Sequence, residues 1–215
     1  MFSREWFLSL IISIPGLLLA ISCHEFAHGW AAFLMGDRTA KYSGRLSLNP
    51  LHHIDPMGAL CMLFFRMGWA KPVPINPNNF KNQRLGIITV SLAGPFANFV
   101  LGLLSCIIYY FIAIFMPPSA FGEFLRDIFI YSVFMNVGLM IFNLIPIPPL
   151  DGSKILLEFL PAKARFTIYQ YERYFSLILI IIVYAGAVTP TISLLQTYVI
   201  QFFEFISLNL VQLFM

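Results

Sequence analysis

The chain has 215 residues, of which 59% are hydrophobic and only 11% are charged, and its mean hydropathy is +0.81. Such a composition cannot cover the surface of a soluble protein, so it excludes a soluble globular domain and predicts an all-α polytopic membrane protein. The net charge of +3 arises without a run of Lys or Arg, which argues against a nucleic-acid partner, and the three widely spaced cysteines do not indicate a disulfide framework.

The first predicted span covers residues 6–35, which is long enough to cross a bilayer with some tilt. Pro15 should kink this helix, as membrane helices tolerate. Residues 1–23 have features of a secretory signal peptide, but cleavage there would leave His24 on a frayed end. We therefore expect the segment to stay in place as a signal anchor and first span.

The segment 37–84 is the most basic part of the chain between two predicted spans, so the positive-inside rule places it in the cytoplasm. Within it, the mostly apolar run 56–69 is too short to span a membrane and predicts a re-entrant or interfacial element. Alternating residues at 44–48 and 72–75 predict two short strands. Together these features predict a small re-entrant β-hairpin or loop between the first and second spans.

The later apolar runs predict further spans, about five in all with the first, at 85–116, 128–143, 174–188 and 191–214. A short outer loop with one basic residue, Arg126, separates the second span from the third. After the third span, three prolines in the sequence NLIPIPPLDG at 143–152 predict a break in the helix near the cytoplasmic border. We therefore divide the chain into a core at 1–160 and C-terminal helical spans at 161–215.

A polar pattern, HEFAH at 24–28, lies inside the first apolar span. His24 and His28 are four residues apart on a helix, so both imidazoles can bind one zinc ion. Glu25 can reach a metal-bound water as a general base without being a ligand. Such groups are costly in hydrocarbon unless they are paired, ligated or facing water, so they predict a functional site. The alternative is a polar cluster that only joins helices.

A catalytic zinc site usually has three protein ligands, and the candidates for the third are His52, His53, Asp55 and Asp151. The inner half of the first span and the end of the third span reach the same leaflet, which favours Asp151. His52 and His53 lie among Asn-Pro and Asp-Pro turns, as is typical of solvated loops. The alternative for Asp151 is a helix N-cap, but Lys154 stands where a capping box has Glu or Gln.

Three motifs, HEFAH at 24–28, LAGPFAN at 92–98 and NLIPIPPLDG at 143–152, resemble the signatures of the site-2 protease family of intramembrane zinc metalloproteases and stand in the same order. The resemblance covers about residues 8–160. It implies peptide-bond hydrolysis within the membrane, with one Zn²⁺ per chain held by His24, His28 and Asp151 and water activated by Glu25. The chain is similar to short forms, without a PDZ-like or nucleotide-sensing domain.

The expected substrate is a transmembrane protein or peptide, cleaved near the cytoplasmic leaflet by an enzyme that crosses the plasma membrane several times. Asn98 and Asn143 lie beside predicted kinks and could hydrogen-bond an extended substrate, to which a strand at 44–48 could add an edge. The alternative for each Asn is a bond between helices. The sequence carries no signal for an oligomeric state.

The rival functions are a catalytically inactive relative of this family and a divalent-metal transporter. A transporter should carry polar residues along several spans or repeated broken helices. Here the last two predicted spans are almost purely apolar, and the polar groups gather on one side of the membrane. These features favour the protease.

Overall fold

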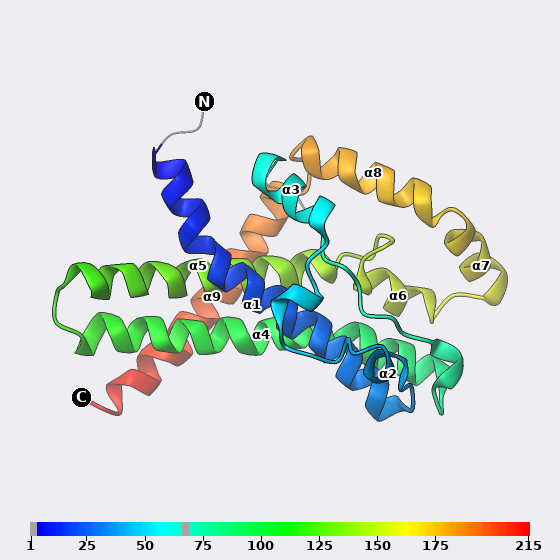
Figure 1. Ribbon diagram of the computed structural model, residues 1–215, viewed down its shortest axis with the longest axis horizontal. Helices are drawn as coiled ribbons and strands as arrows, with labels where there is room; N and C mark the ends of the chain where they lie inside the picture. The colour runs from blue at the N-terminus through cyan, green and yellow to red at the C-terminus, as the bar shows by residue number, and fades with distance from the viewer. Residues whose placement is uncertain (1–3, 66–68) are drawn as a thin grey trace.

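The computed structural model describes residues 4–65 and 69–215, and all regular secondary structure in this part of the chain is helical (Figure 1). The helices in chain order are α1 Arg4–Met35, α2 Thr39–Tyr42, η1 Pro50–His52, α3 Pro56–Phe65, η2 Pro77–Asn79, α4 Gln83–Phe115, α5 Ala120–Asn143, α6 Asp151–Leu157, α7 Ala162–Gln170, α8 Glu172–Tyr184 and α9 Thr189–Gln212. The predicted all-α class is confirmed.

Within the part of the chain that the structure describes, four helices are long and apolar enough to cross a membrane: α1 over Ile11–Met35, α4, α5 and α9. Helices α7 and α8 meet at a bend of 64° and would provide a fifth crossing if they form one span. Helix α8 has 13 residues, about 20 Å, whereas the hydrocarbon core is about 30 Å thick. The span predicted at 174–188 overlaps α8, and a fifth crossing there stays a prediction that requires the bent pair of α7 and α8 to form one span.

The third span begins earlier than predicted, because α5 already includes the charged residues that were assigned to an outer loop. Ser119 Oγ accepts a hydrogen bond of 3.1 Å from the amide of Gly122, and Glu123 stands in the first helical turn. A side-chain cap and an acidic residue both stabilise a helix N-terminus. The loop between α4 and α5 is accordingly reduced to 116–119.

The predicted strands at 44–48 and 72–75 do not form, so no β-hairpin is present among the described residues. Pro72 and Pro74 lack an amide hydrogen, which prevents a regular ladder through the second segment. The alternation of apolar and polar residues predicted strands because it indicates only which side chains share a face. It does not register the backbone amide donors that the prolines lack.

Isolated contacts hold this region together in place of a sheet. Arg45 Nη2 donates to the carbonyl oxygen of Lys71 over 2.8 Å, and Ile54 and Ala70 form a single antiparallel bridge. Helix α3 has 10 residues, about 15 Å, so it is too short to span the membrane, as expected. The remainder of that predicted element, at 66–68, lies outside the described residues.

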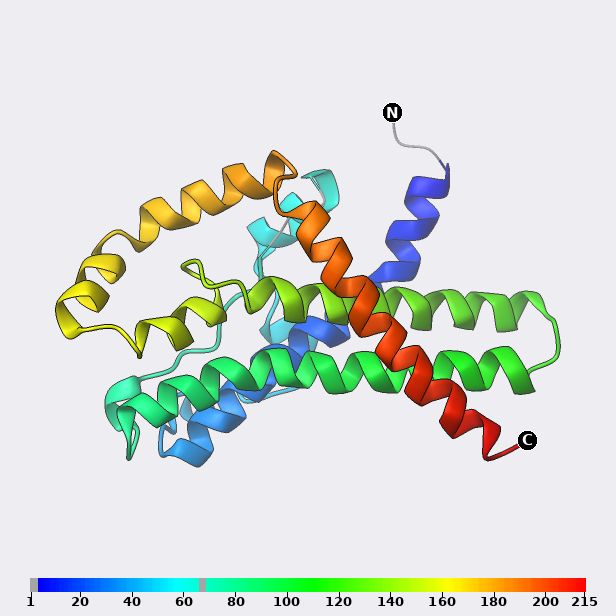
Figure 2. The same ribbon diagram turned by 180° about the vertical axis from the view of Figure 1, so that it is seen from behind.

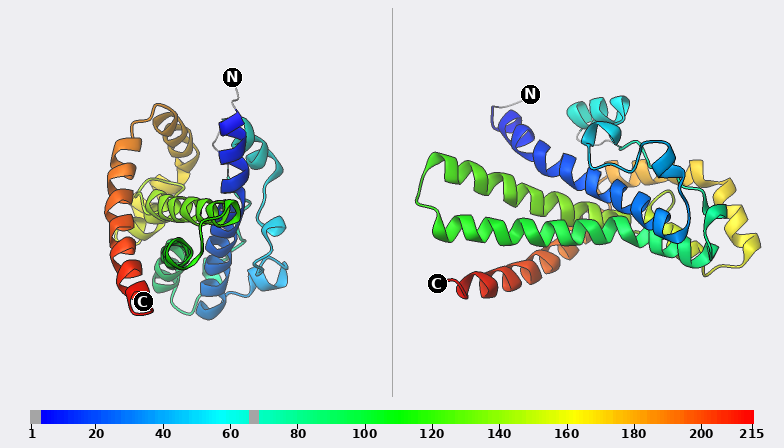
Figure 3. Two further views of the ribbon diagram at one scale, coloured as in Figure 1. Left: turned by 90° about the vertical axis from the view of Figure 1, so that its left-hand side faces the viewer. Right: turned by 60° about the horizontal axis from the view of Figure 1, so that its bottom comes forward.

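Helices α4 and α5 form an antiparallel hairpin, with α1 crossing one side of it and α9 crossing the other (Figures 1 and 2). Figure 3 shows the hairpin end-on, between α1 and α9. Helices α2, α6 and α7 gather at one end of this bundle, and the turn at 116–119 lies at the other end. Helix α3 lies beside the middle of the bundle. The C-termini of α1 and α5 and the N-terminus of α4 lie at the first of these two ends. The motifs at 24–28, 92–98 and 143–152 are therefore near that end.

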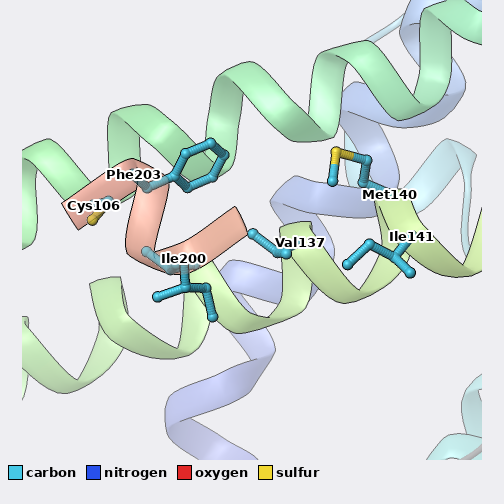
Figure 4. Close-up of a cluster of buried hydrophobic side chains, with 7 residues drawn as sticks. Cys106, Val137, Met140, Ile141, Ile200 and Phe203 are labelled. Atoms are coloured by element: carbon cyan, nitrogen blue, oxygen red, sulfur yellow. The ribbon is translucent and has the colours of Figure 1, made fainter. Parts of the chain in front are cut away.

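The bundle is held by a cluster of buried apolar side chains between α4, α5 and α9 (Figure 4). Phe203 of α9 is fully buried and reaches α4 at Gly102, where an added Cβ would lie 3.0 Å from its ring. On the opposite side, a Cβ on Gly16 of α1 would lie 2.9 Å from the Cα of Ser132. Small residues therefore allow the close helix contacts on which membrane bundles depend.

Candidate metal centre

His24 and His28 lie one turn apart on the buried face of α1. Their Nε2 atoms are 3.0 Å apart, and their rings meet edge to face with centroids separated by 4.5 Å. The residues are only 5% and 7% exposed. The one-turn spacing in the sequence therefore produces the expected pair of adjacent imidazoles.

Asp151 is brought to these imidazoles from the far end of the core, 123 residues after His28 in the chain. Its Oδ2 atom lies 3.2 Å from His24 Nε2 and 3.1 Å from His28 Nε2. Among the described residues, these three form the one cluster of at least three His, Cys, Asp or Glu with suitably placed ligand atoms. Topology had favoured Asp151 over the other candidates, and the structure brings it to the pair.

Hydrogen bonds behind the two rings determine which nitrogens face Asp151. His24 Nδ1 lies 2.6 Å from Asn98 Oδ1, and His28 Nδ1 lies 2.7 Å from the carbonyl oxygen of Val90. Both partners are acceptors, so each Nδ1 carries the hydrogen and each Nε2 presents a lone pair. Two such nitrogens and a carboxylate oxygen therefore converge on one point.

This arrangement fits a zinc ion. Ligand atoms about 2.1 Å from a tetrahedral ion are about 3.4 Å apart. The three separations between His24, His28 and Asp151 are 3.0, 3.1 and 3.2 Å. A small outward movement would seat the ion, and the donor set of two neutral imidazoles and one carboxylate is typical of catalytic zinc.

Gly94 of α4 forms the wall against which both rings lie. An added Cβ at this position would be 2.6 Å from the Cε1 atoms of His24 and His28 and 2.6 Å from His28 Nε2. The glycine of the LAGPFAN motif is therefore required by the close approach of the two imidazoles. Helix α4 continues through the following Pro95.

The segment between α5 and α6 folds back on itself and delivers Asp151 as the first residue of α6. The N-cap position is Leu150, and no side chain caps this helix, so the N-cap alternative for Asp151 is not met. A Cβ on Gly152 would overlap the carbonyl oxygen of Leu144. The Asp-Gly pair therefore combines a ligand with the small residue that lets the chain return.

A cavity of about 640 Å³ opens onto the three ligands. Glu25 lies on its wall, and Glu25 Oε2 accepts a hydrogen bond of 2.9 Å from the amide of Val73. The other polar or ionisable residues that line the cavity are Ser91, Asn143, Lys154, Tyr169 and Glu172. The carboxylate of the HEFAH motif therefore shares an open space with the candidate metal ligands.

The remaining candidates for the third ligand lie outside this cluster. His52 is exposed in η1, and His53 is fully buried with Nε2 2.7 Å from the carbonyl oxygen of Ser47. Asp55 Oδ1 accepts from the amides at the start of α3, including that of Gly58 at 2.9 Å. His53 and Asp55 therefore have local structural roles, and His52 is exposed.

The two asparagines occupy different environments. Asn143 lines the cavity, and its Nδ2 donates to the carbonyl oxygen of Leu139 over 2.9 Å. Asn98 is fully buried, and its Nδ2 donates to the carbonyl oxygen of Ala20 and to Oδ1 of Asn136. Sequence reasoning missed Asn136, although an amide in the middle of an apolar span was a signal for it.

Comparisons with known proteins agree with this geometry. The family profile described as peptidase family M50 matches residues 112–186. "Putative zinc metalloprotease YwhC" of Bacillus subtilis is 38% identical over 164 residues, which cover 74% of this chain and 73% of that protein. "Putative zinc metalloprotease Rip2" of Mycolicibacterium smegmatis is 29% identical over 192 residues, which cover 85% of this chain and 69% of that protein. No solved structure matches.

Proposed function

Because the chain belongs to peptidase family M50, the site-2 protease family of zinc metalloproteases, we propose that it is an intramembrane endopeptidase that cleaves transmembrane segments of other proteins. The observation that carries the proposal is the convergence of His24, His28 and Asp151 on a cavity that Glu25 also lines. This is the arrangement that metal-assisted peptide hydrolysis requires: three ligands, a nearby base and room for a substrate.

His24, His28 and Asp151 are the residues that hold zinc in this proposal. Zinc, when bound there, lowers the pKa of a coordinated water and polarises the scissile carbonyl. Asn98 and the carbonyl oxygen of Val90 keep the two imidazoles in the tautomer that leaves Nε2 free for the metal. We therefore assign Asn98 a positioning role in place of the substrate contact expected from its place in the sequence.

Glu25 acts as the general acid and base in this proposal. It takes a proton from the attacking water and delivers that proton to the leaving amine. The Val73 amide holds Oε2, and we assign the proton transfer to Oε1. Asn143 stays the proposed substrate-binding residue, because it lines the same cavity next to the non-helical segment 144–150.

The cavity lies at the end of the bundle where most basic residues are found. Ten of the basic residues that the structure describes lie in the segments between α1 and α4 and between α5 and α9, or in the first turn of α4: Arg38, Lys41, Arg45, Lys71, Lys81, Arg84, Lys154, Lys163, Arg165 and Arg173. The turn between α4 and α5, at the opposite end, has only Arg126 near it. The positive-inside rule supports a cytoplasmic position for the cavity and a multi-pass enzyme of the plasma membrane.

The test compares the purified protein with its Glu25→Gln variant, using Glu123→Gln as the matched control. Glu123 lies at the far end of the bundle in the first turn of α5. Each form is assayed for zinc per chain and for new protein termini generated in isolated membranes. We expect about one zinc in all three forms and new termini with the wild type and the control only.

Two outcomes would contradict the proposal. Cleavage that persists with Glu25→Gln would end the role of Glu25 as the base. A wild type that contains no zinc would contradict the metal site. A wild type that moves zinc into sealed vesicles and cleaves nothing would favour a transporter.

A further inference from the structure

Lys154 is the basic side chain in contact with the candidate metal centre. Its Nζ lies 3.0 Å from Asp151 Oδ1, whereas the imidazoles approach the other oxygen, Oδ2. We propose that Lys154 is a positioning residue of the metal centre, which holds Asp151 Oδ1 so that the carboxylate offers only Oδ2 to the ion. This inference rests on the metal site proposed above.

The consequence concerns the number of open positions at zinc. A carboxylate can bind a metal through one oxygen or through both. With two imidazoles and one carboxylate oxygen, a four-coordinate zinc keeps one position for water or substrate. If both oxygens of Asp151 bound, that position would be occupied or the coordination number would rise. A hydrogen bond to Oδ1 therefore favours the arrangement that hydrolysis needs.

The environment of this pair differs from that of an ordinary surface ion pair. Exposed pairs contribute little, because water competes for both partners. Here the Asp151 side chain is 6% exposed and that of Lys154 is 45% exposed, and both line the cavity. A ligating carboxylate usually needs a second partner to fix its orientation. The contact thus links a buried ligand to a cation at the edge of the cavity.

A second ion pair, between Glu158 just after α6 and Arg165 of α7, favours the contact of Lys154 with Asp151. On a helix, Lys154 can reach Asp151 three residues before it and Glu158 four residues after it. Glu158 is instead bound by Arg165, whose Nη1 lies 2.7 Å from Glu158 Oε2. Because Glu158 is paired with Arg165, it does not compete with Asp151 for the ammonium group of Lys154.

The experiment uses Co²⁺ as a spectroscopic probe in the metal-free full-length protein. Lys154→Met keeps the length of the side chain and removes the hydrogen bond, and Lys163→Met makes the same change at an exposed residue of α7. We expect Lys154→Met to weaken the visible absorption of bound Co²⁺, as a higher coordination number does, and to bind Co²⁺ about 10- to 100-fold less tightly. Lys163→Met should match the wild type.

Two further variants separate the hydrogen bond from the charge. Lys154→Arg keeps both and should restore the wild-type spectrum, whereas Lys154→Gln keeps a donor without the charge and should be intermediate. If Lys154→Met does not fold, the same measurements are made on Lys154→Ala, and a folded Lys154→Ala with wild-type spectrum and affinity overturns the proposal. A folded Lys154→Met with wild-type spectrum and affinity also overturns it. A wild type that binds no Co²⁺ contradicts the metal site itself.

Discussion

The two sides of the metal centre are built differently. Behind the imidazoles, a chain of hydrogen bonds runs from His24 to Asn98, then to Asn136 and Ser132, and every one of these residues is buried. In front of them, Lys154 is partly exposed and lines an open cavity with Glu25. The buried side orients the two imidazoles, whereas the open side contains Lys154, which we propose orients Asp151, and Glu25, which we propose acts on water and substrate.

Because of this difference, some substitutions should change metal binding, whereas others should change only the rate of cleavage. A buried polar group left without its partner costs about 1–3 kcal/mol, so damage behind the rings moves the ligands. A change at Glu25, or at the amide of Val73 that holds it, leaves the three ligands in place and alters only the groups around the substrate. Measurements of metal content and of cleavage should therefore distinguish substitutions on the buried side from those on the cavity side.

The largest effect is expected for Gly94→Ala, on the buried side. The new Cβ would lie 2.6 Å from atoms of both imidazoles, so the rings must move apart and the ligand set is lost. We expect zinc per chain to fall close to zero, with no detectable cleavage. Gly138→Ala is the control, because its Cβ meets only the flexible end of Gln196. Full zinc content in Gly94→Ala would contradict the close contact.

On the cavity side, Val73→Pro should lower cleavage by about 100-fold and leave zinc content unchanged. The substitution removes the amide that holds Glu25 Oε2, and a misplaced catalytic group costs about that factor. Val73→Ala keeps the amide and should cleave at the wild-type rate. Zinc per chain and the initial rate of cleavage, measured on the same samples, check both expectations. Loss of zinc in Val73→Pro would show that the two sides are not separable.

Asn98→Ala should weaken zinc binding by about 10- to 100-fold, because His24 loses the acceptor that fixes its tautomer. Cleavage should fall at limiting zinc and recover in part at saturating zinc. Competition with a chelator of known affinity provides the measurement. An unchanged zinc affinity would instead leave Asn98 with its alternative role, a hydrogen bond between helices.

The smallest effect on the site is expected for Asp37→Asn, in the loop after α1. Burial opposes the ionisation of Asp37, but hydrogen bonds from Thr39, Asn76 and Asn79 outweigh it and lower the pKa of this carboxyl below its ordinary value. A lowered pKa stabilises the fold above the ordinary value, and this stabilisation is lost as the pH falls through the lowered one. The wild type should therefore melt higher than Asp37→Asn at pH 6, and the gap should close in acid. A gap that is independent of pH would contradict this.

Much of this architecture could be predicted from local signals. Apolar length predicted the helices α1, α4, α5 and α9, and the one-turn spacing of His24 and His28 predicted the paired imidazoles. The proline-rich break at 143–152 predicted the return that brings Asp151 to them. These features depend on nearest neighbours along the chain, or on which end of the bundle each segment reaches.

Other features depend on contacts that local patterns do not contain. The link between Asn98 and His24 joins residues 74 positions apart, so a polar residue in an apolar span predicted a role but not its partner. The strand predicted at 72–75 was wrong because alternation does not register the missing donors of Pro72 and Pro74. Apolar length at 174–188 likewise predicted a span but did not reveal the bend between α7 and α8.

The separation of Asp151 from the imidazoles also has a consequence for biosynthesis. The ribosome makes His24 and His28 early, but the carboxylate that completes the set follows only after α4 and α5 have been synthesised. A nascent chain interrupted before that point contains two histidines and no complete ligand set. In the proposed enzyme, hydrolytic capacity would therefore arise only when the core has been assembled, which would limit damage to neighbouring polypeptides during insertion.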